Sequence, residues 1–127
     1  MSQKSKEFLE KVQEFIPSTR EEYVESVKKY GEVLETVVIE DIFMPKILSL
    51  LVENKNSELL ESIFKYFEEV AHSDDPHLVN IFSTTVLEIL GNDKAILETA
   101  KKYMGSKTMQ LQIEADSELG RRYLTCH

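Results

Sequence analysis

The sequence lacks several features on which small proteins often depend. Its 127 residues include one cysteine, no tryptophan, four glycines and three prolines. Because a lone cysteine has no partner within the chain, an internal disulfide framework is excluded. The few glycines and prolines leave little room for long loops or for the many turns of a β-sandwich. These absences favour regular elements joined by short connections.

Long apolar runs are missing as well. The most apolar stretch, residues 47–52, is six residues long and includes Ser49. A helix that crosses a membrane needs about 20 apolar residues. The segment from Met1 to Glu7 has no apolar core of the kind found in a secretory signal. We therefore expect a cytoplasmic protein that does not bind membranes.

Basic residues are outnumbered and dispersed. The chain has 15 Lys and Arg against 23 Asp and Glu, a formal net charge of −8. Residues 32–91 hold twelve acidic residues and three lysines, so this middle segment alone carries −9. Phosphate binding needs clustered Lys and Arg, so nucleic acid is not an expected ligand. An acidic surface instead favours association with a basic protein.

What the chain does contain is typical of one folded domain. The hydrophobic fraction of 42% and charged fraction of 30% are ordinary for a globular protein, and disorder is not indicated. A chain of this length suits a single hydrophobic core. We expect one domain over residues 1–127, with residues from about 120 to 127, which include Cys126, forming a frayed tail.

Apolar residues recur at the spacing of an amphipathic helix along most of the chain. The prediction is six or seven short helices in an all-α fold, packed as antiparallel hairpins because the links between them are short. Either a HEAT-like stack or an irregular helical bundle satisfies this pattern. The expected segments are 5–16, 19–31, 41–52, 57–72, 75–91, 92–105 and 106–121.

Two of the expected helix starts depend on capping residues, and one segment is ambiguous. Ser18 and Thr19 are each followed three residues later by glutamate, which predicts a capping box. Asp41 is a plausible N-cap, with Pro45 in the first turn of its helix. Residues 33–39 fit either a short helix or an extended connector, because their helical spacing competes with a β-branched run at 36–39.

One cluster has the composition of a metal site. Residues 72–77 read His-Ser-Asp-Asp-Pro-His, so His72, Asp74 and His77 are weak candidate ligands. Helix signals explain the same residues, because Asp75 and Pro76 form a helix start and His72 ends the preceding helix. A zinc site would also need a further anchor, such as a cysteine pair. We therefore expect neither a metal nor a cofactor.

Catalytic motifs are also missing from the sequence. There is no Gly-x-Ser-x-Gly nucleophile elbow and no glycine-rich phosphate loop. Adjacent carboxylates, such as Glu68 and Glu69, are more simply explained as exposed charges than as an acid–base pair. The sequence therefore predicts a protein without enzymatic activity.

Two polar stripes are the candidate partner-binding surface. One lies on the outward face of the fourth expected helix and the other on the fifth, opposite its apolar side. A solvated surface without a partner is the alternative for each stripe. The candidate residues are Glu58, Glu61, Glu68, Glu69, His77, Asn80, Thr84 and Glu88.

Three segments carry a resemblance to a known group of proteins. They are Phe-Lys-Tyr-Phe-Glu-Glu-Val at 64–70, Val-Leu-Glu-Ile-Leu-Gly at 86–91 and Ala-Lys-Lys-Tyr-Met-Gly at 100–105. They resemble small bacterial helical proteins found among the immunity proteins of polymorphic-toxin and contact-dependent inhibition systems. The resemblance implies a cytosolic, helical-repeat-like protein that binds and blocks one toxin domain, often a basic nuclease. Glu88 is the one polar position that it carries over.

These observations lead to two functional hypotheses. The first is a non-enzymatic immunity protein, without a cofactor, that uses its acidic helices to bind and neutralise a basic toxin domain. The second is an adaptor or regulatory protein with the same helical scaffold and a different partner.

Overall fold

The computed structural model describes residues 1–120, and every element in them is helical. Seven continuous helices lie in this part of the chain, so the prediction of an all-α fold with six or seven helices is confirmed. They form a small helical bundle. The frayed tail predicted from about residue 120, including Cys126, lies almost wholly outside the described residues.

Two of the seven helices contain a π-helical turn in their middle. One runs through α3, η1 and α4, and the other through α6, η2 and α7, where η marks the π turn. The elements are α1 (Gln3–Phe15), α2 (Thr19–Tyr30), α3 (Glu35–Val37), η1 (Val38–Phe43), α4 (Met44–Glu53), α5 (Ser57–Ala71), α6 (Pro76–Ile81), η2 (Phe82–Leu87), α7 (Glu88–Leu90), α8 (Lys94–Lys101) and α9 (Ser106–Glu118).

Short polar side chains begin several helices. Ser2 forms a capping box with Ser5, so α1 begins earlier than the predicted residue 5. Asp75 accepts a hydrogen bond from the amide of His77, and Asp93 accepts from the amides of residues 95 and 96, as expected of N-caps. The capping box predicted at Ser18 is wrong, because its side chain makes no cap hydrogen bond.

The ambiguous segment before residue 41 is helical. The helix begins at Glu35 and continues without interruption to Glu53. The prediction that Asp41 is an N-cap is therefore wrong, since Asp41 lies inside η1. Burial of Val38 and Ile39 overrides the extended preference of the β-branched run.

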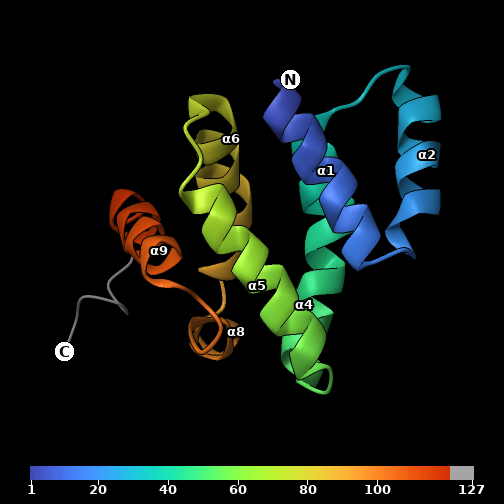
Figure 1. The fold of residues 1–127 in the computed structure, drawn as a ribbon. Coiled ribbons are helices and arrows are strands. Elements are labelled where there is room, and N and C mark those ends of the chain that lie inside the picture. The colour runs from blue at the N-terminus through green and yellow to red at the C-terminus, as the bar shows by residue number, and fades with distance from the viewer. Residues whose placement is uncertain (121–127) are drawn as a thin grey trace.

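The core lies around α5, which crosses the centre of the bundle (Figure 1). Leucine, isoleucine and valine side chains make up most of it, and phenylalanine rings from α1, α5 and η2 form a cluster within it. The Phe64 and Phe67 rings have centroids 5.1 Å apart, and those of Phe67 and Phe82 are 5.3 Å apart, both edge to face. Phe8 of α1 joins this cluster at 6.3 Å from Phe67. Such pairs stabilise a core beyond the burial of their area.

The two edges of the bundle are formed by α2 and α9 (Figure 1). The sequence predicts one apolar face on α2, but only Thr19 is buried there. Val24 is 43% exposed and Tyr30 is 44% exposed, so α2 lies against the bundle without being embedded in it. None of the helices within residues 1–120 has the length and apolar character needed to cross a membrane.

Candidate functional site

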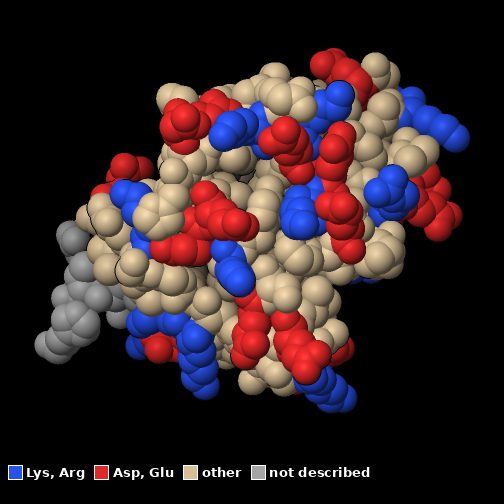
Figure 2. Space-filling model, viewed as in Figure 1, with Lys and Arg blue, Asp and Glu red and all other residues tan. Residues whose placement is uncertain are grey.

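The predicted acidic face of α5 is partly confirmed as a surface. Glu58, Glu61 and Glu69 are exposed, because α5 turns its apolar side toward the core. Figure 2 shows the face of the molecule that α5 crosses, and acidic and basic side chains interleave on it. The acidic excess of the sequence therefore does not form one continuous patch on this face.

Glu68 was predicted to face outward, and that prediction is wrong. Its carboxylate accepts hydrogen bonds from the amide of Lys107 at 3.0 Å and from the amide of Thr108 at 2.9 Å. The Thr108 hydroxyl donates to it at 2.8 Å. Glu68 therefore caps the N-terminus of α9, where backbone N–H groups have no partner within the helix.

The surroundings of Glu68 are built for this contact. A Cβ atom at Gly105 would lie 2.5 Å from the carboxyl carbon of Glu68, so a larger residue there would displace the carboxylate from this position. Burial alone would raise the pKa of Glu68. The hydrogen bonds from Thr108 and Lys107, joined by one with the His72 ring at 3.1 Å, nevertheless lower that pKa below its ordinary value.

The three weak metal candidates make separate contacts. The His72 ring lies against Glu68, and the ammonium group of Lys4 is 3.5 Å from Asp74. The Nε2 atom of His77 is 2.9 Å from Oε1 of Glu35. Within residues 1–120, no group of three His, Cys, Asp or Glu side chains is placed to hold a metal ion.

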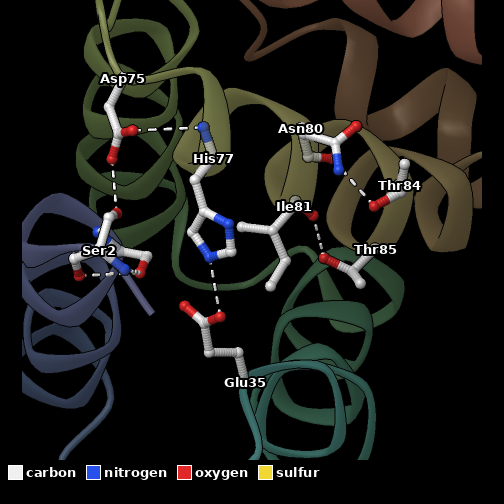
Figure 3. Close-up of polar contacts among 9 residues, drawn as sticks. Ser2, Glu35, Asp75, His77, Asn80, Ile81, Thr84 and Thr85 are labelled. Carbon is white, nitrogen blue, oxygen red and sulfur yellow. Dashed lines mark hydrogen bonds and ion pairs between the residues drawn. The ribbon is translucent and has the colours of Figure 1, made fainter.

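Asp75 is the N-cap of α6, and its side chain connects α6 to the start of α1. Its carboxylate accepts from the Ser2 hydroxyl at 2.5 Å and from the amide of His77 at 3.2 Å (Figure 3). The bond from Ser2, supported by the amide of His77, lowers the pKa of Asp75.

The polar stripe on α6 does not continue the acidic face of α5. Figure 3 shows His77 directed toward Glu35 of α3, with Asn80 and Thr84 farther along the same helix. The Thr84 hydroxyl donates to the backbone oxygen of Asn80 at 2.9 Å. In Figure 1, α5 lies in front of α6, and the contact of His77 is with α3, not with α5. Glu88, at the start of α7, is partly buried.

Sequence reasoning missed a cleft between α1 and α5. The cleft has a volume of about 490 Å³ and is lined by Lys4, Glu7, Tyr66, Glu69, Val70, His72, Ser73, Asp74 and Leu78. It brings Glu69, His72 and Asp74 together with residues of α1, sixty or more positions away in the chain. The i, i+3 spacing of Tyr66 and Glu69 places both residues on one side of α5 and could have indicated part of this cleft. The contribution of Glu7 depends on the packing of α1 against α5.

Tyr66 forms the aromatic wall of this cleft. Its ring stacks on Phe8 at 6.1 Å and lies 5.8 Å from the ring of Phe15. Burial, followed by the charges of Glu69 and Glu7, raises the pKa of the Tyr66 phenol to about 12. The partly exposed ring thus has two carboxylates near it, and the lysine of the cleft, Lys4, is paired with Asp74, so the site suits a cationic side chain.

The sequence profile of one family, described as "Domain of unknown function (DUF7674)", matches residues 9–119. The chain belongs to this family. The matched region begins within α1 and includes the remaining six helices, so Tyr66 and Glu69 lie inside it while Lys4 and Glu7 precede it. No curated protein matches the chain, and no solved structure matches it either.

Proposed function

We propose that this protein is a non-enzymatic binding module for a basic protein partner, and that the α1–α5 cleft receives a lysine or arginine side chain of that partner. The observation that carries the proposal is that Tyr66, Glu7 and Glu69 line one cleft, with both carboxylates close enough to act on the Tyr66 phenol. Neither glutamate side chain has a hydrogen bond or ion pair among residues 1–120. A cationic side chain would gain two charge contacts and the face of an aromatic ring.

The remaining charge supports the same partner class. A net charge of −8 attracts a basic protein over distances longer than any single contact, and it repels nucleic acid and anionic membranes. Exposed Glu58 and Glu61 extend the acidic surface along α5 away from the cleft. These residues would contribute more to the association rate than to the lifetime of the complex, because they are solvated.

The specific form of the proposal is an immunity protein. In this form the partner is a basic toxin domain in the cytoplasm, and binding blocks the toxin by covering its surface or by repelling its substrate. The resemblance in the segments at 64–70, 86–91 and 100–105 supports this form. The first of these segments contains both Tyr66 and Glu69.

The test compares charge-reversed forms of the full chain as bait in extracts of the native cell. We expect wild-type protein to retain a basic protein that the Glu7→Lys/Glu69→Lys variant loses. A Glu58→Lys/Glu61→Lys variant should retain it with association slowed on the order of tenfold at low salt. Added salt should slow wild-type association as well, because it screens the same charges.

A matched control carries the same change in net charge elsewhere. Glu53→Lys/Glu114→Lys alters two exposed glutamates outside the cleft and should bind as wild type does. Equal loss in the control and cleft variants would show a general charge effect and would remove the cleft from the proposal. If the captured partner is acidic or if nothing is captured, the proposed function is wrong. A basic partner without toxic activity would favour the adaptor hypothesis.

A further inference from the structure

A second surface, formed by α2 and η1, lies outside the α1–α5 cleft and has no role in the function proposed above. The two elements border a groove of about 240 Å³, lined by Glu22, Glu25, Ser26, Lys29, Tyr30, Val37, Asp41 and Ile42. We call it the α2–η1 groove. The groove remains open because α2 contacts η1 but buries only one of its own residues, Thr19.

The apolar part of the groove comes from three side chains. Tyr30 is 44% exposed, Val37 is partly buried, and Ile42 is buried against the core beneath them. Here Tyr30 stays partly exposed, with the ammonium group of Lys29 over its ring at 5.2 Å from the centroid.

The rim of the groove is acidic. Glu22, Glu25 and Asp41 line it, against one lysine, Lys29. The ammonium group of Lys46 approaches Glu22 only to 4.0 Å, so it offsets little of this charge. An incoming chain would therefore meet an apolar floor and a negative edge.

The charge of the rim decides between the possible occupants. A second copy of this chain would bring its own acidic rim and a net charge of −8 to the contact. In a two-fold dimer the same glutamates would face one another, which disfavours association. A segment rich in lysine or arginine has the complementary charge.

Two further features place the groove beside unusual local structure. The hydroxyl of Ser26 is shielded from solvent and has no hydrogen-bond partner among the described residues. The floor of the groove belongs partly to η1, and π turns are rare features that occur often at functional sites. The groove therefore combines a shielded hydroxyl, unpaired within residues 1–120, with a π turn in one wall.

We propose that the α2–η1 groove docks a basic segment of a partner protein. One apolar side chain of that segment packs on Tyr30, Val37 and Ile42, while its Lys or Arg residues pair with Glu25 and Asp41. This inference rests on the proposed function in one respect, the basic character of the partner. It adds a second contact surface with a different chemistry, in which an apolar anchor supplies the specificity.

The test uses two synthetic peptides with blocked ends, one of alternating lysine and leucine and one of alternating glutamate and leucine. Each is titrated into the isotope-labelled full chain while backbone amide shifts are recorded. With the lysine peptide we expect saturable shift changes in α2, Val37 and η1, in addition to any that it causes at the α1–α5 cleft. The glutamate peptide should cause none at concentrations up to about 1 mM.

Variants separate the apolar anchor from the charged rim. Tyr30→Ser should weaken binding of the lysine peptide about tenfold, because it removes the exposed side of the apolar floor. Glu25→Gln/Asp41→Asn should weaken it several-fold and reduce its salt dependence. Glu53→Gln/Glu114→Gln, which neutralises the same number of exposed charges outside both surfaces, is the matched control and should leave the affinity unchanged. Thermal unfolding of each variant verifies that it is folded.

The outcomes also separate this inference from the proposed function. Shift changes at the α1–α5 cleft alone would overturn the groove assignment and leave the proposed function intact. No saturable binding, equal binding of both peptides, or unchanged affinity in Tyr30→Ser would overturn the groove assignment as well. Binding in the groove, together with failure to capture any basic protein from cells, would support the groove and contradict the proposed function.

Discussion

At the scale of single residues, Glu68 and Glu69 show how neighbours in sequence take opposite roles. Each residue of an α-helix is rotated by about 100° from the one before it. Glu68 therefore reaches the N-terminus of α9, whereas Glu69 lines the cleft against α1. The sequence presents both as exposed glutamates. The difference comes from which helix lies next to each side chain.

The contact between Glu68 and α9 predicts a specific pH dependence. Because the folded-state pKa of Glu68 is lowered, its contribution to stability is complete above the ordinary carboxyl value. It is lost as pH falls through the lowered value and the carboxylate becomes protonated. Wild type should therefore be more stable than Glu68→Gln by about 1–2 kcal/mol near neutral pH, and this difference should shrink in acid. Denaturant unfolding at a series of pH values measures it.

Glu61 provides the control, since it lies on the same helix and has no hydrogen bond or ion pair within residues 1–120. Glu61→Gln should match wild type to within about 0.5 kcal/mol at every pH. The stability difference between wild type and Glu68→Gln should not stay constant down to the lowest pH measured. A constant difference would contradict the assignment of a charged contact between Glu68 and α9, because it would not follow the charge of the carboxylate.

At the scale of elements, the two π turns are the main departure from regular structure. A π turn holds one more residue per turn than an α-helix, so each residue rotates less. Consecutive side chains can then share one buried face, as Ile42, Phe43 and Met44 do around the end of η1. In η2, Thr85 to Leu87 are buried in the same way. The η1 and η2 turns also contact each other in the centre of the bundle.

Deleting one residue tests whether η1 is an inserted turn in an otherwise regular helix. Removal of exposed Glu40 should convert η1 to α-helix and keep the buried side chains of α4 facing the core. We expect a folded protein with stability within about 2 kcal/mol of wild type. Circular dichroism and thermal unfolding measure helix content and stability.

The comparison is the removal of exposed Ser62 from α5, which has no π turn. That deletion should turn the following buried side chains, including Phe64 and Phe67, by about 100° away from the core. It should abolish cooperative unfolding. Similar behaviour of the two deletions would show that η1 does not accommodate an extra residue.

At the scale of the whole molecule, the bundle has an apolar centre and two weakly attached edges. The buried face of α5 consists of large apolar residues, with Phe64 and Phe67 fully buried. The buried side of α9 is instead Thr108, Gln112, Ala115 and Asp116. Gln112 donates to the backbone oxygen of Leu87 at 2.9 Å, so polar contacts attach this helix. Little apolar area is buried by α2 or α9.

Native-state hydrogen exchange should follow this division. We expect amides of α2 and α9 to exchange through local opening, well before those in the middle of α5, because opening an edge exposes little apolar surface. Protection measured residue by residue on the full chain provides the test. Equal protection of α5 and α9 would mean that the polar contacts of α9 unfold only with the core.

Much of the fold followed from local signals. The helices at 57–71 and 76–90 were predicted closely because Asp75 and Pro76 mark a boundary and the apolar spacing on each side is regular. The helix start at Glu35 was not predicted. The β-branched residues that follow it are compatible with either a helix or a strand, and tertiary packing determines which one forms. Among the site residues, Glu69 was found by its exposure pattern, while Tyr66 and Glu7 were missed.

The sequence alone determined the all-α class, the positions of most helices and the acidic character of the molecule. These properties depend on residues close together in the chain, through periodicity, capping and composition. Tertiary structure decided which glutamate caps α9, which residues of α1 meet Tyr66, and that α2 remains at the edge. Those outcomes depend on contacts between segments tens of residues apart, and local patterns carry no information about which helices become neighbours.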